Sequence, residues 1–442
     1  MLEQITEELR KQDHVHDWLV RHVRKTSTQY YVIGSRPESR RTVTTEQATV
    51  TVMNNHSLGQ KGNGLMRGEA EVTILPADLP RVQEKLDQAI FMATLTDNPI
   101  YGLPASSRYP TVDLVDSEIQ TRPKQVAERM VERLTEAVTA EKGVRLSSAE
   151  VFVEESHITL QNSRGASGHQ VQTELLFDIV LLASGRQEEM EAHAAFTRRR
   201  ATDLDVPALT QRHAQYARDA LMAGTPETGV FPVVVSDQAL AELLMSSGYS
   251  PLVLRSSAQL KYQRVSPWEI GKSIFAEEPS GDPLTVYSNA LLPFGTRSGS
   301  FDDEGLSGQR VMIIDTGSLA SFWAGQRYAE YLSIPATGRF GNMEIAAGSI
   351  PFGDLCDAQG PLYHIVAFSA MDPDPLTGDF VGEIRLGYEI CGRQTRPIKG
   401  GSISGNLFDA LAGAQFSRET VFLGDYEGPR GMRFPKVTVA GK

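Results

Sequence analysis

Residues 298–348 constrain the fold of this chain most, because turn-forming residues interrupt them repeatedly. The acidic sequence FDDEG occupies 301–305, and the alternating segment QRVMII at 309–314 runs into Asp315-Thr316-Gly317. This pattern is typical of a strand that ends in a hairpin turn. The sequence TGRFGN at 337–342 then places two glycines close together, and glycine adopts backbone angles that other residues resist. The stretch predicts short strands joined by tight turns.

The N-terminal part changes its hydrophobic period along the chain. Residues 1–26 carry apolar side chains near helical spacing, which predicts helix; they are Leu2, Ile5, Leu9, Val15, Leu19 and Val23. Residues 30–52 include runs of β-branched residues that favour strands. A further strand at 71–75 and an amphipathic helix over 79–93 follow. This order predicts an antiparallel sheet with helices on one face.

A second unit repeats this theme without repeating the sequence. Pro123 suits a first helical turn, and the residues after it form an i, i+4 apolar stripe: Val126, Met130, Leu134 and Val138. Strand candidates lie at 151–153, 158–160 and 175–183. Asp205 is a good N-cap for a helix that reaches residue 223.

Length and element order together predict the domains. A chain of 442 residues exceeds what one core usually holds. From residue 230 onward, short strand-like runs alternate with glycine and proline turns. We predict an α+β fold with two small N-terminal α/β subdomains, 1–110 and 111–225, each with an antiparallel sheet. A β-rich C-terminal domain, 226–442, follows them.

Composition excludes several classes of protein. Hydrophobic residues make up 40% and charged residues 22% of the chain, as in ordinary globular proteins. No apolar run approaches the roughly 20 residues of a membrane span. The N-terminus is polar, and two cysteines cannot build a disulfide framework, so we expect a cytoplasmic protein. A net charge of −12 argues against direct nucleic-acid binding.

The FDDEG turn, the strand that closes on a glycine and the TG-x-x-GN loop together resemble the C-terminal domain of the TldD/PmbA family. Further matching motifs occur in the same order along the chain: NSRG at 162–165, FPVVV at 231–235, IGK at 270–272, TGDF at 377–380 and GNL at 405–407. The ending PKVTVAGK at 435–442 is similar to the PmbA, or TldE, branch. The resemblance extends from about residue 20 to the C-terminus.

The resemblance also implies where a zinc site would lie. In the TldD branch, an H-E-x-x-x-H helix binds zinc, and in this chain Met245 and Ser250 stand in the register of the two histidines. Ser246 stands where the glutamate would be, and residues 424–429 contain no cysteine. Neither methionine nor neutral serine is a competent zinc donor here. We therefore expect no metal and no cofactor in this chain, with zinc only in a TldD-like partner.

The sequence also contains candidates for acid–base catalysis and for peptide contacts. The clustered carboxylates of Asp302, Asp303 and Glu304 would repel one another and raise a pKa, which suits acid–base catalysis, although a structural turn is the preferred reading. His364 is a further catalytic candidate, weighed against a hydrogen-bonded histidine at the core edge. Arg339 and Asn342 are candidates for contacts with a peptide carboxylate or backbone, weighed against loop solvation.

By resemblance, this chain is a non-catalytic subunit that partners a TldD-type zinc metallopeptidase in degrading or maturing short unstructured peptides. It would hold an extended peptide by strand addition and form a dimer, with a TldD-like chain or with itself. One alternative is a stand-alone, divergent TldD-like enzyme for a specialised peptide or metabolite. Another is a regulatory binding protein of the gyrase-modulator type. The sequence identifies neither the peptide nor the partner.

Overall fold

The fold is described from a computed structural model, which covers residues 1–57, 64–186, 188–245 and 250–442. Its N-terminal part, up to residue 225, is built on one antiparallel sheet of six strands in the order β3-β2-β1-β4-β5-β6. Its elements are α1 (Leu2–Arg10), β1 (Asp17–Ile33), β2 (Arg36–Ser57), β3 (Leu65–Ile74), η1 (Pro76–Arg81), α2 (Val82–Ala93), α3 (Ser117–Thr121), α4 (Pro123–Ala140), β4 (Val144–Asn162), β5 (Ser167–Ser184), β6 (Glu189–Arg198), η2 (Ala201–Asp203) and α5 (Val206–Met222).

Two separate helical layers cover this sheet. Helices α1 and α2 pack on the first part of β1, where Trp18 and Val20 are buried. Helix α4 packs on β4 and on the last part of β1, where Tyr30 and Val32 are buried, and α5 packs on β5 and β6. Each layer thus has its own core. Strand β1 of the predicted first subdomain, 1–110, nevertheless pairs with β4 of the predicted second subdomain, 111–225, from Leu19 to Ile33. One sheet therefore belongs to both subdomains.

The predicted helix of residues 1–26 is wrong beyond residue 10. Helix α1 ends at Arg10, and residues 17–33 form β1. Strand β1 is paired with β2 on one side and β4 on the other. Its even residues Trp18 and Val20 face the helices, whereas Leu19 joins a cluster on the opposite face. Pairing on both sides overrides the helical spacing of Leu19 and Val23.

The C-terminal part contains two further sheets, so the predicted α+β class and its β-rich C-terminal domain are confirmed. Its elements are β7 (Gly229–Ser236), α6 (Asp237–Met245), α7 (Pro251–Arg255), α8 (Ala258–Tyr262), β8 (Val286–Asn289), β9 (Arg310–Asp315), β10 (Ser318–Leu319), α9 (Gln326–Leu332), β11 (Asn342–Ile345), α10 (Phe352–Leu355), β12 (Leu362–Pro373), β13 (Asp379–Cys391), β14 (Gln394–Ile398), β15 (Ser402–Asn406), α11 (Leu407–Ala412), β16 (Gln415–Phe416), β17 (Thr420–Phe422), β18 (Tyr426–Pro429) and β19 (Gly431–Ala440).

One sheet has the order β10-β9-β8-β11-β18-β17, and the other has the order β12-β7-β19-β15-β13-β14. In the second sheet β12 also pairs with β13, so the sheet closes on itself. The two sheets share one large hydrophobic core, to which Met343 of β11 and Phe434 of β19 both belong. This shared core holds the loops between β8 and β11 against a rigid base.

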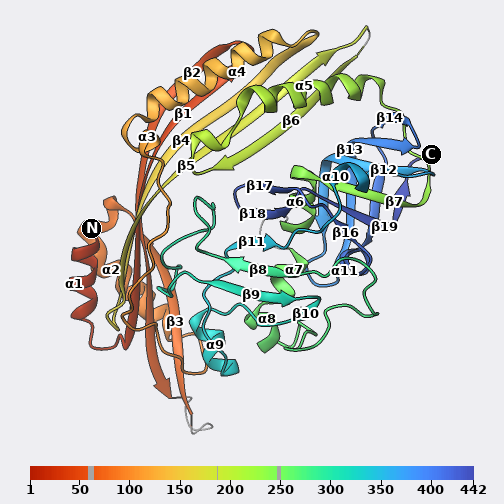
Figure 1. Ribbon diagram of the computed structural model, residues 1–442. Helices are drawn as coiled ribbons and strands as arrows, with labels where there is room; N and C mark the ends of the chain where they lie inside the picture. Colours follow the sequence, from red (N-terminus) through yellow and green to blue (C-terminus); the bar gives the residue numbers. More distant parts are fainter. Residues whose placement is uncertain (58–63, 187, 246–249) are drawn as a thin grey trace.

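The N-terminal sheet arches over the C-terminal part, with α4 and α5 on its outer side (Figure 1). The two parts meet through polar contacts and through small apolar clusters, one of which joins Leu19 and Leu160 of the sheet to Phe301. Gly168 of β5 lies against the ring of Phe301, where a Cβ would come within 2.6 Å of a ring carbon. Arg385 of β13 pairs with Glu191 of β6 at 2.7 Å. Among the described residues, no helix is both long and apolar enough to cross a membrane.

Helix α4 begins at Pro123 as predicted, and its stripe is a core face. Val126 and Leu134 are both 0% exposed, and Met130 is 1% exposed. We expect Leu134→Ala to lower the free energy of unfolding by about 2–5 kcal/mol, through lost burial and the cavity left behind. Lys124→Ala, on the exposed side of the same helix, should change it by less than about 0.5 kcal/mol. Denaturant melts measure both variants, and equal small effects would contradict the core assignment.

Candidate functional site

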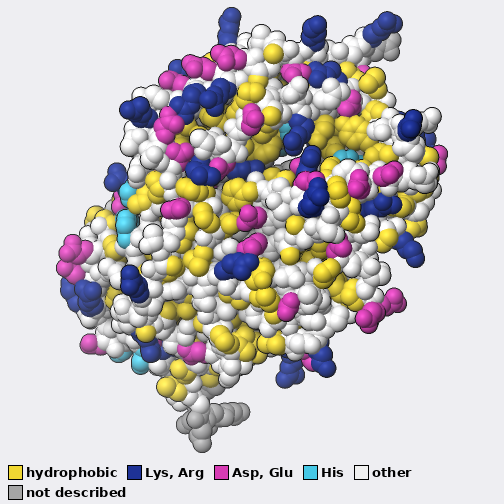
Figure 2. Space-filling model, in the orientation of Figure 1, with side chains coloured by type: hydrophobic (Ala, Val, Ile, Leu, Met, Phe, Trp, Pro, Cys, Tyr) yellow, Lys and Arg dark blue, Asp and Glu magenta, His cyan; other side chains and the backbone are white. Residues whose placement is uncertain are grey.

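A groove runs between the inner face of the N-terminal sheet and the loops of the C-terminal part. Strand register places polar side chains on this face; they include Arg21, Lys25, Thr49, Thr51, Glu154, Gln170, Gln172 and Glu174. Figure 2 shows the molecule hollowed between the two parts, with charged side chains around the opening. Three adjoining pockets make up the groove, and each has its own charge.

The three pockets are named by their contents. The acidic pocket contains Glu69, Glu71, Asp303 and Glu304. The arginine pocket contains Arg21, Arg199, Arg297 and Arg339, and it shares Arg21 and Asp303 with the acidic pocket. The α6 pocket contains His193, Glu242, Met245 and Asp425. Asp425 lies close enough to Arg297 to influence its pKa, so the last two pockets are neighbours.

Asp302 organises the FDDEG turn. One carboxylate oxygen accepts hydrogen bonds from the backbone N–H of Glu304 at 3.0 Å and of Leu306 at 2.9 Å. The other accepts from the N–H of Arg339 at 3.1 Å, which ties the turn to the TG-x-x-GN loop. Burial raises the pKa of Asp302, and these three N–H bonds oppose that rise. Gly305 completes the turn at φ 92°, in the left-handed region.

Glu304 is the strongest acid–base candidate of the predicted set. Its Oε2 accepts a hydrogen bond of 2.6 Å from the N–H of Gln326 at the start of α9. Gly325 makes room for this contact, because a Cβ there would lie 2.7 Å from Oε2. Burial, reinforced by the charge of Asp302, raises the pKa of Glu304 to about 7. The carboxyl group can therefore gain or lose a proton near neutral pH.

Asp303 joins the two parts of the protein. Its carboxylate pairs with Arg21 of β1 at 3.0 Å and with Arg339 at 3.0 Å. The predicted residues Asp302, Asp303, Glu304 and Arg339 thus lie together in the groove. The Arg21–Asp303 pair stands at the border between the acidic and arginine pockets, since both residues line both pockets.

Asn342 lies beneath the groove and is 0% exposed. Its side-chain N–H groups donate to the carbonyl of Asn289 at 2.6 Å and to the Ser298 hydroxyl at 2.8 Å. Its side-chain oxygen accepts from the N–H of Arg297 at 2.9 Å. The amide is fully occupied in holding the 295–298 loop, so Asn342 positions Arg297 rather than contacting a ligand.

His364 is separated from the acidic turn in the fold. It lies in β12, where its Nε2 is 2.9 Å from the Ser236 hydroxyl and its ring packs on Phe352. Burial lowers the pKa of His364 to about 4, which keeps the imidazole neutral at pH 7. These contacts fit the structural interpretation of this histidine.

The α6 pocket contains candidates that were not predicted from the sequence. Burial raises the pKa of Glu242 to about 7, and the nearby His193 opposes this rise. His193 itself lies 3.1 Å from both carboxylate oxygens of Asp178. Burial also raises the pKa of Asp425. A lone glutamate within the apolar run 239–245 was the one available signal for this pocket.

Comparisons with known proteins agree with the fold and the motifs. Residues 228–441 match the family model of the PmbA/TldA metallopeptidase C-terminal domain. The C-terminal half of the chain is a PmbA/TldD-family domain. The crystal structure of TldE from Thermococcus kodakarensis covers 100% of both chains with a TM-score of 0.83 and 17% identity. The family resemblance predicted from the motifs is therefore confirmed.

Two curated relatives are similar over part of their length. A metalloprotease from Archaeoglobus fulgidus is 25% identical over 173 residues, which are 36% of this chain and 40% of the relative. A zinc metalloprotease TldD homolog from Saccharolobus solfataricus is 23% identical over 210 residues, 43% of this chain and 44% of the relative. The chain spans half or less of the length of the curated relatives it matches.

The residues in the zinc register of this PmbA/TldD domain do not fit zinc. Met245 is a buried core residue that ends α6. Ser250 is 0% exposed, and its hydroxyl accepts from the N–H of Leu252 at 3.2 Å as the cap of α7. Ser246 lies outside the described residues. Within the described ranges, no group of three His, Cys, Asp or Glu side chains is arranged to hold a metal.

The pKa of Glu304 has a consequence for stability. The folded protein binds this proton more tightly than the unfolded chain, whose carboxyl titrates near 4.5, so the contribution to stability falls as the pH rises from about 4.5 to about 7. When the pH is raised from 5 to 8, we expect the free energy of unfolding of Glu304→Gln to increase by about 1–3 kcal/mol relative to that of the wild type. Urea melts at both pH values measure this gain. Exposed Glu277→Gln is the control, and an equal gain in both variants would disprove the assignment.

Proposed function

We propose that this chain is a non-catalytic, peptide-holding subunit that works with a TldD-type zinc metallopeptidase on short unstructured peptides. The observation that carries this proposal is the groove. It lies between two protein parts, and its walls carry many polar side chains among apolar ones. In the register of the family resemblance, Met245 and Ser250 stand where the catalytic branch has its histidines. A chain that retains the groove but lacks the zinc donors suits binding rather than hydrolysis.

Polar walls suit an unstructured peptide, whose backbone must exchange its hydrogen bonds with water for others. Gln170 and Gln172 of β5 line the arginine pocket, and Thr49 and Thr51 of β2 line the acidic pocket. Each amide and hydroxyl group offers both a donor and an acceptor. The groove therefore supports contacts with peptide backbone that do not depend on side-chain sequence.

A stand-alone enzyme is the second candidate. Glu242 in the α6 pocket favours it, because a carboxyl group with a pKa of about 7 beside the His193–Asp178 pair is suited to general acid–base catalysis. This candidate predicts hydrolysis that persists in the presence of chelator. A regulatory binding protein of the gyrase-modulator type remains an alternative, without a specific contact in its favour.

We expect the purified chain alone to contain well under one zinc ion per molecule and to show no chelator-sensitive peptidase activity. The reason is the donor chemistry of Met245 and Ser250. Metal analysis and hydrolysis of mixed short peptides, with and without chelator, measure this. Cleavage that chelator abolishes and zinc restores would refute the non-catalytic role. Cleavage that survives chelator but disappears in Glu242→Gln would favour the second candidate.

The proposal also requires a partner. We expect a TldD-like chain with an intact H-E-x-x-x-H sequence to co-purify from the native host. In its absence, the chain should pair with itself. Light scattering at micromolar concentration should give about twice the mass of one chain. A stable interface of this kind would bury more than about 2,000 Å². A monomer without any co-purifying homologue would count against the partnership.

A further inference from the structure

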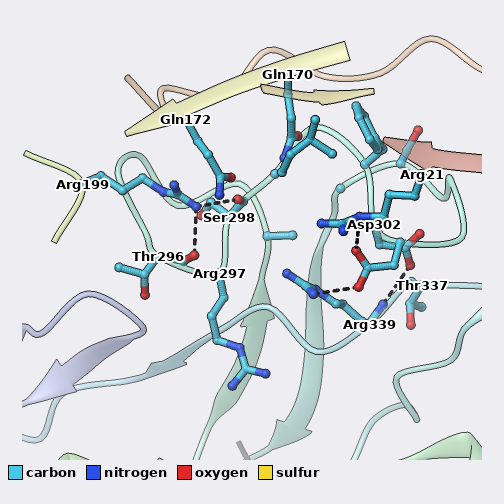
Figure 3. A pocket seen from close by; sticks show the side chains of 18 residues that line it. Arg21, Gln170, Gln172, Arg199, Thr296, Arg297, Ser298, Asp302, Thr337 and Arg339 are labelled. Carbon is cyan, nitrogen blue, oxygen red and sulfur yellow. Dashed lines mark hydrogen bonds and ion pairs between the residues drawn. The ribbon is translucent and has the colours of Figure 1, made fainter. Parts of the chain in front are cut away.

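Four arginines from four separate segments converge on the arginine pocket. Arg21 comes from β1, and Arg199 directly follows β6. Arg297 and Arg339 come from the loops between β8 and β9 and between α9 and β11. Figure 3 shows Gln170 and Gln172 on the sheet side of this pocket, with the guanidinium of Arg297 extending away from the sheet. Residues so distant in sequence meet only because the sheet arches over the C-terminal loops.

Arg199 and Arg21 both contact other groups of the protein. Arg199 is 1% exposed and donates to the carbonyls of Gly295 at 2.7 Å and Thr296 at 2.8 Å, and more weakly to Thr173 and Ser298. Arg21 is paired with Asp303. The hydrogen-bonding geometry of Arg199 is therefore fixed by the protein itself, whereas Arg21 is held by one ion pair.

The other two guanidinium groups have donors to spare. Within the described residues, the guanidinium of Arg297 makes no hydrogen bond or ion pair, and no dashed line reaches it in Figure 3. Arg339 pairs with Asp303 through its Nη1 only, and Asp303 also pairs with Arg21. An arginine has five N–H donors, so most donors of Arg297 and Arg339 remain for another group.

The pocket also has an excess of positive charge. Burial lowers the pKa of Arg297, and the charge of Arg339 lowers it further, while Asp425 opposes both effects. Burial also lowers the pKa of Arg199; the charge of Glu174 opposes this effect, and the charge of Arg339 adds to it. Of the two acids in this pocket, Asp303 serves two arginines, and Asp302 is occupied by three backbone N–H groups. A bound anion would relieve this repulsion among the arginines.

We propose that Arg297 and Arg339 bind a carboxylate of the ligand, namely the free C-terminal carboxylate of a short peptide. This assignment rests on the proposed peptide-holding function. Planar guanidinium forks match a carboxylate with two parallel hydrogen bonds. Glu69, Glu71 and Glu304 in the adjacent acidic pocket would repel a carboxylate, which directs it to the arginine side of the Arg21–Asp303 pair.

The test compares two probes that differ only at one end. N-acetylated penta-alanine with a free C-terminus and its C-terminal amide are titrated calorimetrically into the protein, expressed in its native host and purified in the assembly that it forms. Chelator is present throughout, and the salt concentration is low. Wild-type protein should bind the free acid about tenfold or more tightly than the amide, the size expected of charge-assisted hydrogen bonds.

Variants assign this preference to residues. Arg297→Gln should reduce the preference at least about fivefold, and Arg297→Lys, which keeps the charge but not the fork, should lie between it and the wild type. Arg393→Gln, an exposed arginine in the turn after β13, is the matched control and should keep the preference. A third peptide, an amide with a penultimate glutamate, separates an acidic side chain from the C-terminus as the source of the carboxylate.

Each outcome has one meaning. Equal binding of the acid and the amide would overturn the carboxylate site and leave the peptide-holding function intact. Tighter binding of the glutamate amide than of the free acid would overturn the C-terminal assignment. If neither peptide binds, the peptide-holding function fails, and N-acetylalanine then tests the site alone. Thermal protection of the wild type but not of Arg297→Gln by N-acetylalanine would support the site, and its absence from both would overturn it.

Discussion

The hydrogen bonds of the Arg199 guanidinium are the contact on which the groove depends. A charged group that is only 1% exposed is costly unless its N–H donors are satisfied. Here the acceptors are backbone carbonyls of the 295–298 loop and of Thr173. Satisfying Arg199 therefore fixes the path of a loop in the C-terminal part against the N-terminal sheet. Asn342 binds the same loop by accepting a hydrogen bond from the backbone N–H of Arg297. Arg199 and Asn342 together therefore fix the backbone that carries Arg297.

The groove persists because its walls cannot collapse onto each other. Glutamines, threonines and charged side chains face one another across it, and polar groups lose hydration if they are buried without partners. The large apolar cores lie elsewhere, under the helices of the N-terminal sheet and between the two C-terminal sheets. A smaller apolar cluster, which includes Leu19 and Phe301, joins the two parts at the groove. Glu242 and Glu304, whose pKa values are both raised to about 7, mark where this arrangement leaves carboxyl groups poorly hydrated.

Local patterns predicted local structure well. The buried stripe of α4 and the Asp205 cap of α5 follow from rules that act within one helix. The helix predicted beyond residue 10 was wrong because strand pairing with β2 and β4 decided the outcome. The FDDEG turn and Arg339 could be named as candidate site residues from their motifs, and the structure brings them together. Arg297, Arg199 and Glu242 could not, because their environments are made by residues far away in sequence.

The pairing of β1 with β4 has a consequence for synthesis. Strand β2 follows β1 at once, but β4 begins only at Val144, so the other edge of β1 stays open while more than a hundred residues are translated. At typical elongation rates this interval is roughly 5–25 seconds. An unpaired strand edge is a template for aggregation, and positive charges along it discourage that. Arg21 and Lys25 lie on β1 on the face that lines the groove, so positive charges of the finished groove are also charges on the strand whose edge is open during synthesis.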